Sequence, residues 1–268
     1  MSATRSRRSG TRLGKYKIVR RIAEGGFATV YRARDTVEGI DVALKIPLAT
    51  EVGPGLLEEF AREARLTAEL EHPNILSLKN ADVIEGTFVL AYRLGEESLA
   101  DRLERRIGVP KGVDWSEQLL RGLAHAHASA IIHCDIKPDN IILFPGGILR
   151  LADFGLARVT AKTRTVSGSG TIGYMAPEQA LGRPSPRSDV FSACLTIHRL
   201  LGGLSPKWPF EWPPPRHERV QQNTPEFSSV LRRGLKVDAR QRFADAGELL
   251  EAFVSARKRW ERRRSRET

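Results

Sequence analysis

The sequence predicts an α+β protein in which a small antiparallel β-sheet with one helix precedes a larger, mainly helical part. Short apolar segments of strand length dominate roughly the first ninety residues, and amphipathic segments of helix length dominate after Arg93. Two further short strands surround Gly146-Gly147, between helices. This order indicates two lobes with a β-hairpin at their junction, and a cleft between two such lobes is a common ligand site.

In the first part, strands are expected at residues 16–23, 29–33, 42–46, 76–84 and 87–92. The helix at 55–70 has an apolar stripe formed by Leu56, Phe60, Thr67 and Leu70, and Glu63 falls within that stripe. An ionised carboxylate that faces a protein interior needs a cationic partner. The alternative is a helix edge at which Glu63 reaches water.

In the second part, helices are expected at residues 98–106, 113–130, 188–201 and 245–253, with strands at 141–144 and 148–151. The helix at 188–201 is apolar on nearly every side and should be buried, and Gly202-Gly203 should end it. Asp245 and Glu248 have the spacing of a capping box at the start of the last helix.

The formal net charge of +11 is concentrated at the two ends of the chain. Residues 1–15 carry five basic side chains and no acidic one, and residues 257–268 carry seven basic and two acidic ones. The remaining residues hold 31 basic (43 − 12) and 30 acidic (32 − 2) side chains, a balance that argues against nucleic acid as the main partner. We expect both ends to be mobile, solvated extensions that could dock on an acidic partner or an anionic membrane surface.

Composition excludes several other classes of protein. A hydrophobic fraction of 41% argues against disorder of the whole chain, and no apolar run approaches the roughly 18 residues of a membrane span. The basic first ten residues have no apolar run behind them, unlike a secretory signal. Cys134 and Cys194 cannot by themselves form a disulfide framework or a four-ligand zinc site. A cytoplasmic location is the expectation that follows.

Two features of the first part point to phosphate chemistry. The segment 22–30 contains Gly25-Gly26 between two strands, and glycine lets backbone amides approach a phosphate closely, although such a turn is a weak signal alone. Lys45 ends an apolar strand and therefore needs a partner. Lys45 and Glu63 are therefore predicted to pair, because each would compensate the buried charge of the other.

The second part carries a denser cluster. Asp135 can accept a proton, Lys137 can neutralise phosphate charge, and Asn140 can bind a hard cation through oxygen. Asp153 follows the second short strand, so Asn140 and Asp153 lie on either side of one hairpin and both oxygens could face one site. This donor set suits Mg²⁺, which takes one or two protein oxygens together with phosphates and water.

Taken together, these motifs resemble the eukaryotic-like (Hanks-type) serine/threonine protein kinases of bacterial type, over about residues 16–253. The resemblance implies a bilobal kinase fold at 16–255, with an N-lobe at 16–92 and a C-lobe at 94–255, flanked by basic tails at 1–15 and 256–268. It also implies transfer of the γ-phosphoryl group of ATP, with Mg²⁺ or alternatively Mn²⁺, to Ser or Thr hydroxyls of protein substrates. The oligomeric state is left open.

The resemblance further implies a role for each residue of the motifs. Asp135 would be the catalytic base, Lys137 and Lys45 would contact phosphate, Glu63 would hold Lys45, and Asn140 and Asp153 would bind the metal. Nucleotide contacts would come from Ile22, Ala23, Gly25, Gly26, Val30, Ala43, Lys45, Ala91, Arg93 and Ile142, with the backbone of Ala91 and Arg93 facing adenine and Leu90 behind it. Structural roles would fall to a Glu178–Arg242 ion pair and to Asp189, which would tie down the backbone of the catalytic loop.

Lys137 and Thr171 are similar to the serine/threonine branch of the family. Three positions depart from the family pattern: Ala23 and Ala28 replace glycines, and Cys134 replaces the arginine that precedes the base. The loss of that arginine implies weaker dependence on activation-loop phosphate, although the hydroxyls at Thr160, Thr163, Thr165, Ser167 and Ser169 favour autophosphorylation. The alternatives are a pseudokinase or nucleotide-binding scaffold and a small-molecule phosphotransferase. The presence of all the residues assigned to catalysis and metal binding argues against a pseudokinase or scaffold. The segment 171–178, which in protein kinases shapes a peptide site, argues against a small-molecule phosphotransferase.

Overall fold

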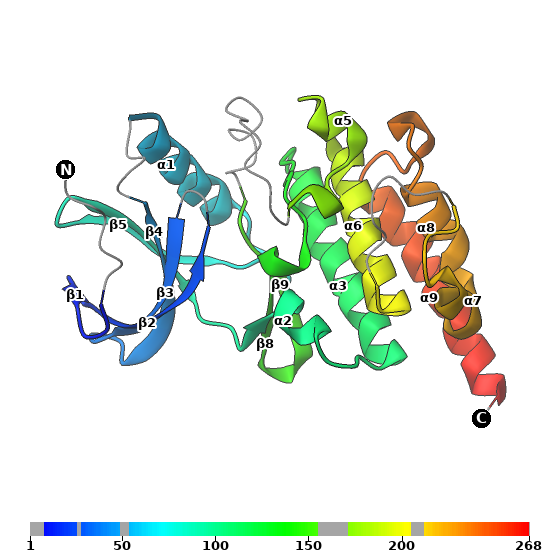
Figure 1. Cartoon of the computed structure of the whole chain (residues 1–268), viewed down its shortest axis with the longest axis horizontal. Helices are drawn as coiled ribbons and strands as arrows, with labels where there is room; N and C mark the ends of the chain where they lie inside the picture. Colours follow the sequence, from blue (N-terminus) through cyan, green and yellow to red (C-terminus); the bar gives the residue numbers. More distant parts are fainter. Residues whose placement is uncertain (1–7, 26–27, 49–53, 155–170, 205–211, 268) are drawn as a thin grey trace. The chain divides into compact units, whose positions relative to one another are not determined.

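The first part of the chain folds around a six-stranded antiparallel sheet with the strand order β1-β2-β3-β4-β6-β5 (Figure 1). Its elements are β1 (Arg12–Leu13), β2 (Tyr16–Glu24), β3 (Ala28–Asp35), β4 (Ile40–Pro47), α1 (Pro54–Glu69), β5 (Leu78–Ile84) and β6 (Thr87–Arg93). The five predicted strands and the predicted helix are all present. The additional strand β1 lies in the segment expected to be a mobile tail, where Leu13 is buried and pairs with Tyr16.

The computed structural model describes residues 8–25, 28–48, 54–154, 171–204 and 212–267. These residues form two compact units. The first takes the described residues up to Glu71, then Leu76–Gly95 and Phe154, and the second takes His72–Ile75, Glu96–Asp153 and the described residues that follow. The two units correspond to the β-rich and helical parts expected from the sequence.

The two faces of the first sheet have different chemistry, because side chains alternate along each strand. In β4, Val42, Leu44 and Ile46 are buried in the hydrophobic core on one face. The intervening residues Ala43 and Lys45 therefore lie on the opposite face. The polar contacts of Lys45 described below come from α1, which places the helix on that face.

The second unit is mainly helical and contains a three-stranded sheet. Its elements are β7 (Glu97–Ser98), α2 (Leu99–Leu103), α3 (Val109–Ala128), η2 (Pro138–Asn140), β8 (Ile141–Phe144), η3 (Pro145–Gly147), β9 (Ile148–Leu151), η4 (Thr171–Tyr174), α5 (Pro177–Ala180), α6 (Pro186–Gly202), α7 (His217–Asn223), η5 (Pro225–Phe227), α8 (Ser228–Gly234), η6 (Ala239–Gln241) and α9 (Ala246–Glu267). The hairpin β8–β9 has the predicted bounds. As expected, α6 is buried along most of its length and ends at Gly202, followed by Gly203 in the left-handed conformation at φ 82°.

The prediction of a mobile C-terminal extension is wrong for residues 257–267, because α9 continues through them to Glu267. The indole of Trp260 is only 4% exposed and donates to the carbonyl of Asn223 at 3.2 Å, while its ring lies 6.5 Å from that of Phe227. Arg263 pairs with Glu226 at 2.7 Å. The basic segment is therefore held by apolar and ionic contacts at once.

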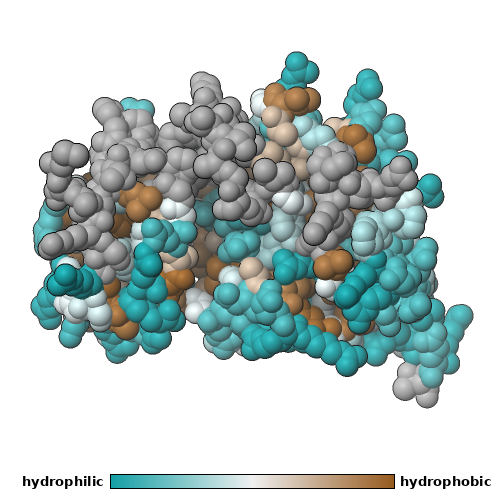
Figure 2. Space-filling view, viewed as in Figure 1, coloured by the Kyte–Doolittle hydropathy of each residue, from teal (hydrophilic) through white to brown (hydrophobic). Residues whose placement is uncertain are grey.

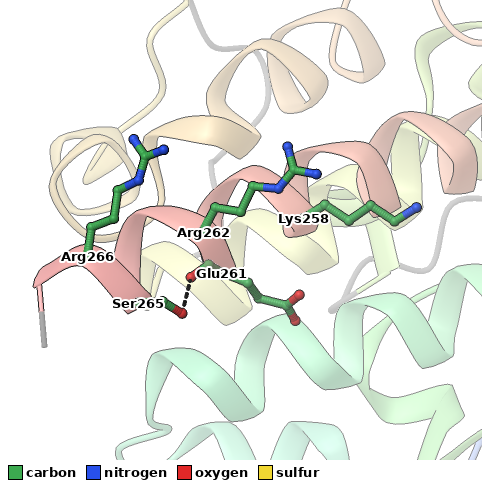
Figure 3. Close-up of a pocket in the computed structure, with 5 residues that line it drawn as sticks. All are labelled: Lys258, Glu261, Arg262, Ser265 and Arg266. Carbon is green, nitrogen blue, oxygen red and sulfur yellow. Dashed lines mark hydrogen bonds between the residues drawn. The ribbon is translucent and has the colours of Figure 1, made fainter.

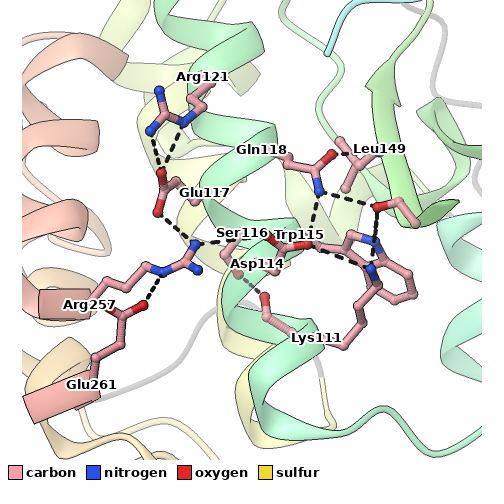
Figure 4. A network of polar contacts seen from close by, with 12 residues as sticks. Lys111, Asp114, Trp115, Ser116, Glu117, Gln118, Arg121, Leu149, Arg257 and Glu261 are labelled. Atoms are coloured by element: carbon pink, nitrogen blue, oxygen red, sulfur yellow. Dashed lines mark hydrogen bonds and ion pairs between the residues drawn. The ribbon is translucent and has the colours of Figure 1, made fainter. Parts of the chain in front are cut away.

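A second ionic contact joins the same segment to α3 (Figure 4). Arg257 donates to Glu117 at 2.9 Å and to Glu261 at 2.8 Å, and Glu117 also accepts from Arg121. At the start of α9, the backbone N–H of Glu248 donates to Asp245, as a capping box requires, but the Glu248 carboxylate accepts from Ala244. The predicted capping box is thus half formed. No helix in the described ranges is both long enough and apolar enough to cross a bilayer.

Two stacked histidines are buried between α6 and α7. The rings of His198 and His217 lie 5.6 Å apart at an interplanar angle of 13°, and the Nε2 of His217 is 2.7 Å from the Ser228 hydroxyl. Burial lowers the pKa of His198 to about 4 and also lowers the pKa of His217. Both imidazoles are therefore neutral in the folded protein near neutral pH.

Folding stability should fall on mild acidification because of this pair. In the unfolded chain a histidine has a pKa of about 6.5, so below that pH the unfolded state binds more protons than the folded state. The stability contributed by His198 is complete above about pH 6.5 and is lost as pH falls towards about 4. The free energy of unfolding should be lower by roughly 2–3 kcal/mol at pH 4.5 than at pH 7.5. The measurement is urea unfolding at a series of pH values between these two. A His198→Gln variant should show a shallower decline, and an unchanged decline would assign it to other groups.

Candidate functional site

The charge pair predicted in the first unit is present and buried. The Lys45 ammonium on β4 lies 2.9 Å from Oε1 and 3.0 Å from Oε2 of Glu63 on α1, and Glu63 is 1% exposed. The Lys45 nitrogen also lies 5.6 Å from the centre of the Phe60 ring, within range of a cation–π contact. Glu63 thus faces the interior, and the alternative that it reaches water at a helix edge is wrong.

The turn between β2 and β3 keeps its hairpin pairing up to the glycines. Ala23 pairs with Val30, Glu24 pairs with Thr29, and the Gly25 amide donates to the Ala28 carbonyl at 2.9 Å. Neither alanine that replaces a family glycine has a positive φ, so the strand conformation accommodates their Cβ atoms. Ile22 lies on β2 and is 37% exposed, and Gly26 lies outside the described residues.

Strand β6 carries the residues predicted to face adenine. Ala91 lies between Leu44 on one neighbouring strand and Asn80 on the other. Arg93 at the end of the strand is exposed, and among the described residues it pairs only with Val42. The sheet register therefore surrounds the backbone of Ala91 more fully than that of Arg93. Ala43 pairs with Tyr92, and Leu90 pairs with Lys45 and is fully buried. The adenine contacts of these residues stay predictions.

In the second unit, three residues of the predicted catalytic loop converge. Asp135 Oδ2 accepts from the Lys137 ammonium at 2.8 Å and from the Asn140 side-chain amide at 2.8 Å. The 3₁₀ turn η2 brings Asn140 back to this carboxylate, and its amide also donates to the Asp135 carbonyl at 2.9 Å. Within the described residues, both side-chain contacts of Asp135 fall on Oδ2. Because this carboxylate is 30% exposed, its Oδ1 can accept a proton from outside.

Asn140 and Asp153 flank the hairpin β8–β9, as the sequence predicted. Ile141 pairs with Leu151, and the Ala152 amide donates to the Asn140 carbonyl at 2.8 Å, so the backbones on either side of the hairpin are joined at this end. Because the Asn140 side-chain nitrogen is used by Asp135, its side-chain oxygen is the atom left for a cation. One amide and one carboxylate oxygen fit Mg²⁺, which otherwise binds phosphates and water. Ile142, one residue further, pairs with Ser98 on β7.

His133 holds this loop in a way that the sequence did not reveal. The Asp135 amide donates to His133 Nδ1 at 3.2 Å, so that nitrogen must be an acceptor. His133 Nε2 lies 2.8 Å from the Ala152 carbonyl and must therefore carry the proton. The neutral imidazole links the residue after the hairpin to the backbone of Asp135. His133 precedes Asp135 by two residues, and that adjacency was the available signal.

The predicted tie between Asp189 and the catalytic loop is confirmed. Asp189, fully buried at the start of α6, accepts from the amides of His133 at 2.7 Å and Cys134 at 2.8 Å, and His127 Nε2 lies 2.9 Å from it. Cys134 has a positive φ of 64°, a strained conformation for a residue with a side chain. The two bonds from Asp189 hold this part of the backbone in place.

The ion pair between Glu178 and Arg242 is also confirmed. The Arg242 guanidinium donates to Glu178 Oε1 at 2.8 Å and to Oε2 at 3.1 Å, and its side chain is 0% exposed. Its remaining donors reach the carbonyls of Lys236, Arg187 and Val237. All five N–H groups of the guanidinium therefore have acceptors.

Comparisons with known proteins agree with this arrangement. The family model of the protein kinase domain matches residues 16–252. The serine/threonine-protein kinase PknA of Mycobacterium tuberculosis is 34% identical over 269 residues, which cover 91% of this chain and 62% of PknA. The serine/threonine-protein kinase drp72 of Corynebacterium efficiens is 34% identical, over 88% of this chain and 49% of drp72. The chain thus spans less than two thirds of these relatives.

A solved structure has the same fold. The crystal structure of the Mycobacterium tuberculosis PknI kinase domain superimposes with a TM-score of 0.71 over 94% of this chain and 99% of that one. The two sequences are 24% identical, so this likeness concerns the fold alone.

Proposed function

Because the chain belongs to the protein kinase domain family, we propose that it transfers the γ-phosphoryl group of ATP to Ser and Thr hydroxyls of proteins. The observation that carries this proposal is the cluster at Asp135, whose carboxylate is oriented by Lys137 and Asn140. A carboxylate held in this way can accept the proton of an attacking hydroxyl. The relatives named as serine/threonine kinases support the choice of acceptor.

The proposed roles follow from charge and geometry. Lys45, fixed by Glu63, contacts phosphate oxygens of ATP, and Lys137 neutralises the charge that develops on the transferred group. Asn140 and Asp153 would hold Mg²⁺, which neutralises phosphate charge when bound. Asp135 Oδ1 takes the proton of the substrate hydroxyl. Catalysis then comes mainly from positioning and from compensation of charge.

The principal alternative is a scaffold that binds nucleotide without chemistry. The contacts on Asp135 favour the enzyme, since a scaffold has no need of an oriented carboxylate. The test is incubation with MgATP labelled at the γ-phosphate, alone and with a basic test protein, followed by phosphoamino-acid analysis. Label on Ser or Thr is expected. Absence of label with measurable ATP binding would establish the scaffold, and label on small molecules alone would establish a different phosphotransferase.

The same experiment addresses the polar stretch that contains Thr160, Thr163, Thr165, Ser167 and Ser169, which lies outside the described residues. We propose that autophosphorylation falls there. Phosphopeptide mapping should place label between 159 and 171. Its absence from that segment would reject this site while leaving the transfer activity intact.

We further propose that the enzyme acts in the cytoplasm and that its helix α9 contacts an anionic membrane surface. Among the cations of α9, Arg257 and Arg263 pair with carboxylates of other elements. Lys258, Arg262 and Arg266 are exposed at spacings of four residues and are called here the cationic row. The guanidinium groups of Arg262 and Arg266 point to one side of α9, and Glu261 points to the other (Figure 3). Together with Ser265 these residues line a shallow depression of about 420 Å³.

The chemistry of this surface favours a membrane over an acidic protein. Protein interfaces centre on aromatic and apolar anchors, and the described length of α9 has no large exposed hydrophobic residue in the row's neighbourhood. The end of α9 is hydrophilic in the space-filling view (Figure 2). Cations near an anionic leaflet contribute about 1 kcal/mol each. Such a surface therefore needs no apolar anchor.

Neutralising the cationic row should weaken membrane binding at least tenfold, because up to about 3 kcal/mol of attraction is removed and salt screens part of it. The measurement is sedimentation with phosphatidylserine-containing vesicles at low salt, for the Lys258→Gln/Arg262→Gln/Arg266→Gln variant. A matched variant, Arg20→Gln/Arg183→Gln/Lys236→Gln, removes the same charge at other exposed positions and should bind normally. Equal binding by the two variants would show that the cationic row is not the membrane contact. No binding by the unmodified chain would favour an acidic protein partner.

A further inference from the structure

The hydroxyl of Tyr92 adds a third member to the Lys45–Glu63 pair. The register of β4 and β6 pairs Lys45 with Leu90 and Ala43 with Tyr92. Residues paired in an antiparallel ladder share a face, so Tyr92 lies on the face that carries Lys45, away from the hydrophobic core cluster. Its hydroxyl donates to Glu63 Oε1 at 3.1 Å, and the residue is 8% exposed.

Glu63 thereby receives hydrogen bonds from two strands. Lys45 on β4 donates to both carboxylate oxygens, and Tyr92 on β6 adds a second donor to Oε1. A carboxylate that is 1% exposed has lost its hydration, so each remaining donor counts for more than it would in water. Hydrogen bonds to a charged group are stronger and shorter than neutral ones.

The two donors also differ in the flexibility of their side chains. Lys45 reaches Glu63 through a flexible four-carbon chain, whereas the Tyr92 hydroxyl is carried on a rigid ring with two rotatable bonds. The ring stands on β6, a strand paired on both sides, by β4 and β5. The position of Oε1 is therefore set more firmly by Tyr92 than by Lys45. Around the same helix, Phe60 contacts Phe88 edge-on at 6.0 Å, which supplies the apolar part of the attachment.

We propose that Tyr92 is a positioning residue for phosphate binding: its hydroxyl fixes Glu63 on α1, and Glu63 in turn fixes the Lys45 ammonium. The inference rests on the proposed function, in which Lys45 contacts the phosphates of ATP. Nothing in the sequence pattern marked Tyr92, because the contact depends on the register between β4 and β6. Tyr92 acts through Glu63 and touches no reacting atom.

Replacing Tyr92 by Phe should raise the KM for ATP about tenfold, the factor expected for one hydrogen bond to a buried charge. The KM for the protein substrate should stay unchanged, since Tyr92 acts on the phosphate side only. KM does not depend on the fraction of enzyme that is folded, so partial loss of folded protein cannot produce the effect. Tyr31→Phe is the matched control, because Tyr31 is a buried tyrosine of the same sheet that pairs with Leu44, on the core face.

A double-mutant cycle with Glu63→Gln tests the route of the effect. If Tyr92 acts through Glu63, Tyr92→Phe should change the KM for ATP little further in the Glu63→Gln background. Full additivity of the two changes would overturn the proposal, as would an unchanged KM in Tyr92→Phe alone. Failure of the proposed function can be told apart from failure of this inference, because the unmodified protein would then transfer no phosphate. In that case the double-mutant cycle would be measured as the affinity for a fluorescent ATP analogue.

Discussion

Replacing Asp135 by Asn should lower the rate of phosphoryl transfer by about 10²–10⁴-fold at saturating ATP. Asparagine has nearly the same shape as aspartate. Its side-chain oxygen can still accept from Lys137 and Asn140, which donate to Asp135 Oδ2 in the unmodified protein. It cannot take up the proton of the substrate hydroxyl. The loss should therefore appear in kcat, while the KM for ATP changes little.

The measurement is the initial rate of label transfer to a basic test protein, at several ATP concentrations. Asp139→Asn provides a matched control, because Asp139 lies in the same loop and is exposed. It should retain the rate of the unmodified protein. If Asp135→Asn transferred label as fast as Asp139→Asn, the assignment of Asp135 as the base would fail.

Replacing Glu178 by Ala should destabilise the protein by about 3–5 kcal/mol, the usual cost of leaving one partner of a buried ion pair alone. Arg242 cannot give up its charge, and its side chain is 0% exposed, so water cannot readily replace the carboxylate. Two of its five N–H groups would lose their acceptors. A change of this size is a large share of the 5–15 kcal/mol typical of folded domains.

Urea unfolding followed by circular dichroism measures this effect. The double variant Glu178→Ala/Arg242→Met should lose less stability than the sum of the two single variants, because it leaves no buried charge unpaired. The pair formed by Asp238 and Arg240, in the same region but on the surface, gives the control, and Arg240→Ala should leave the midpoint unchanged. A similar midpoint for Glu178→Ala and Arg240→Ala would contradict the structural role of Glu178.

One part of the site could be predicted because charged residues stand in otherwise apolar patterns. Glu63 interrupts an apolar stripe and Lys45 ends an apolar strand, so each requires a partner, and the two are bonded to each other. The tie between Asp189 and the catalytic loop was implied by the resemblance to protein kinases, and the amides of His133 and Cys134 supply its donors. Burying an unpaired charge costs so much free energy that a charged residue in an apolar pattern indicates a partner.

The parts that the sequence did not predict depend on register or on competing signals. The contact of Tyr92 with Glu63 follows from which residues of β4 and β6 are paired, and no spacing along the chain encodes that pairing. The end of α9 carries two competing signals. An apolar stripe of helical spacing indicates a packed helix, and it is formed by Leu249, Phe253, Ala256 and Trp260. The surrounding arginines indicate a solvated tail, and the sequence prediction followed them.

The docking of α9 determines where a fragment of this protein can be cut. A chain ended at residue 255 would lose Trp260, and the Phe227 ring would lose one of its aromatic neighbours, leaving Phe253 at 4.6 Å. Glu226 would lose Arg263, and Glu117 would keep Arg121 but lose Arg257. A shortened fragment that looks complete by its motifs would thus carry a newly exposed apolar surface beside the Glu226 carboxylate, which would have lost Arg263. A fragment ended at Glu267 would keep all of these contacts.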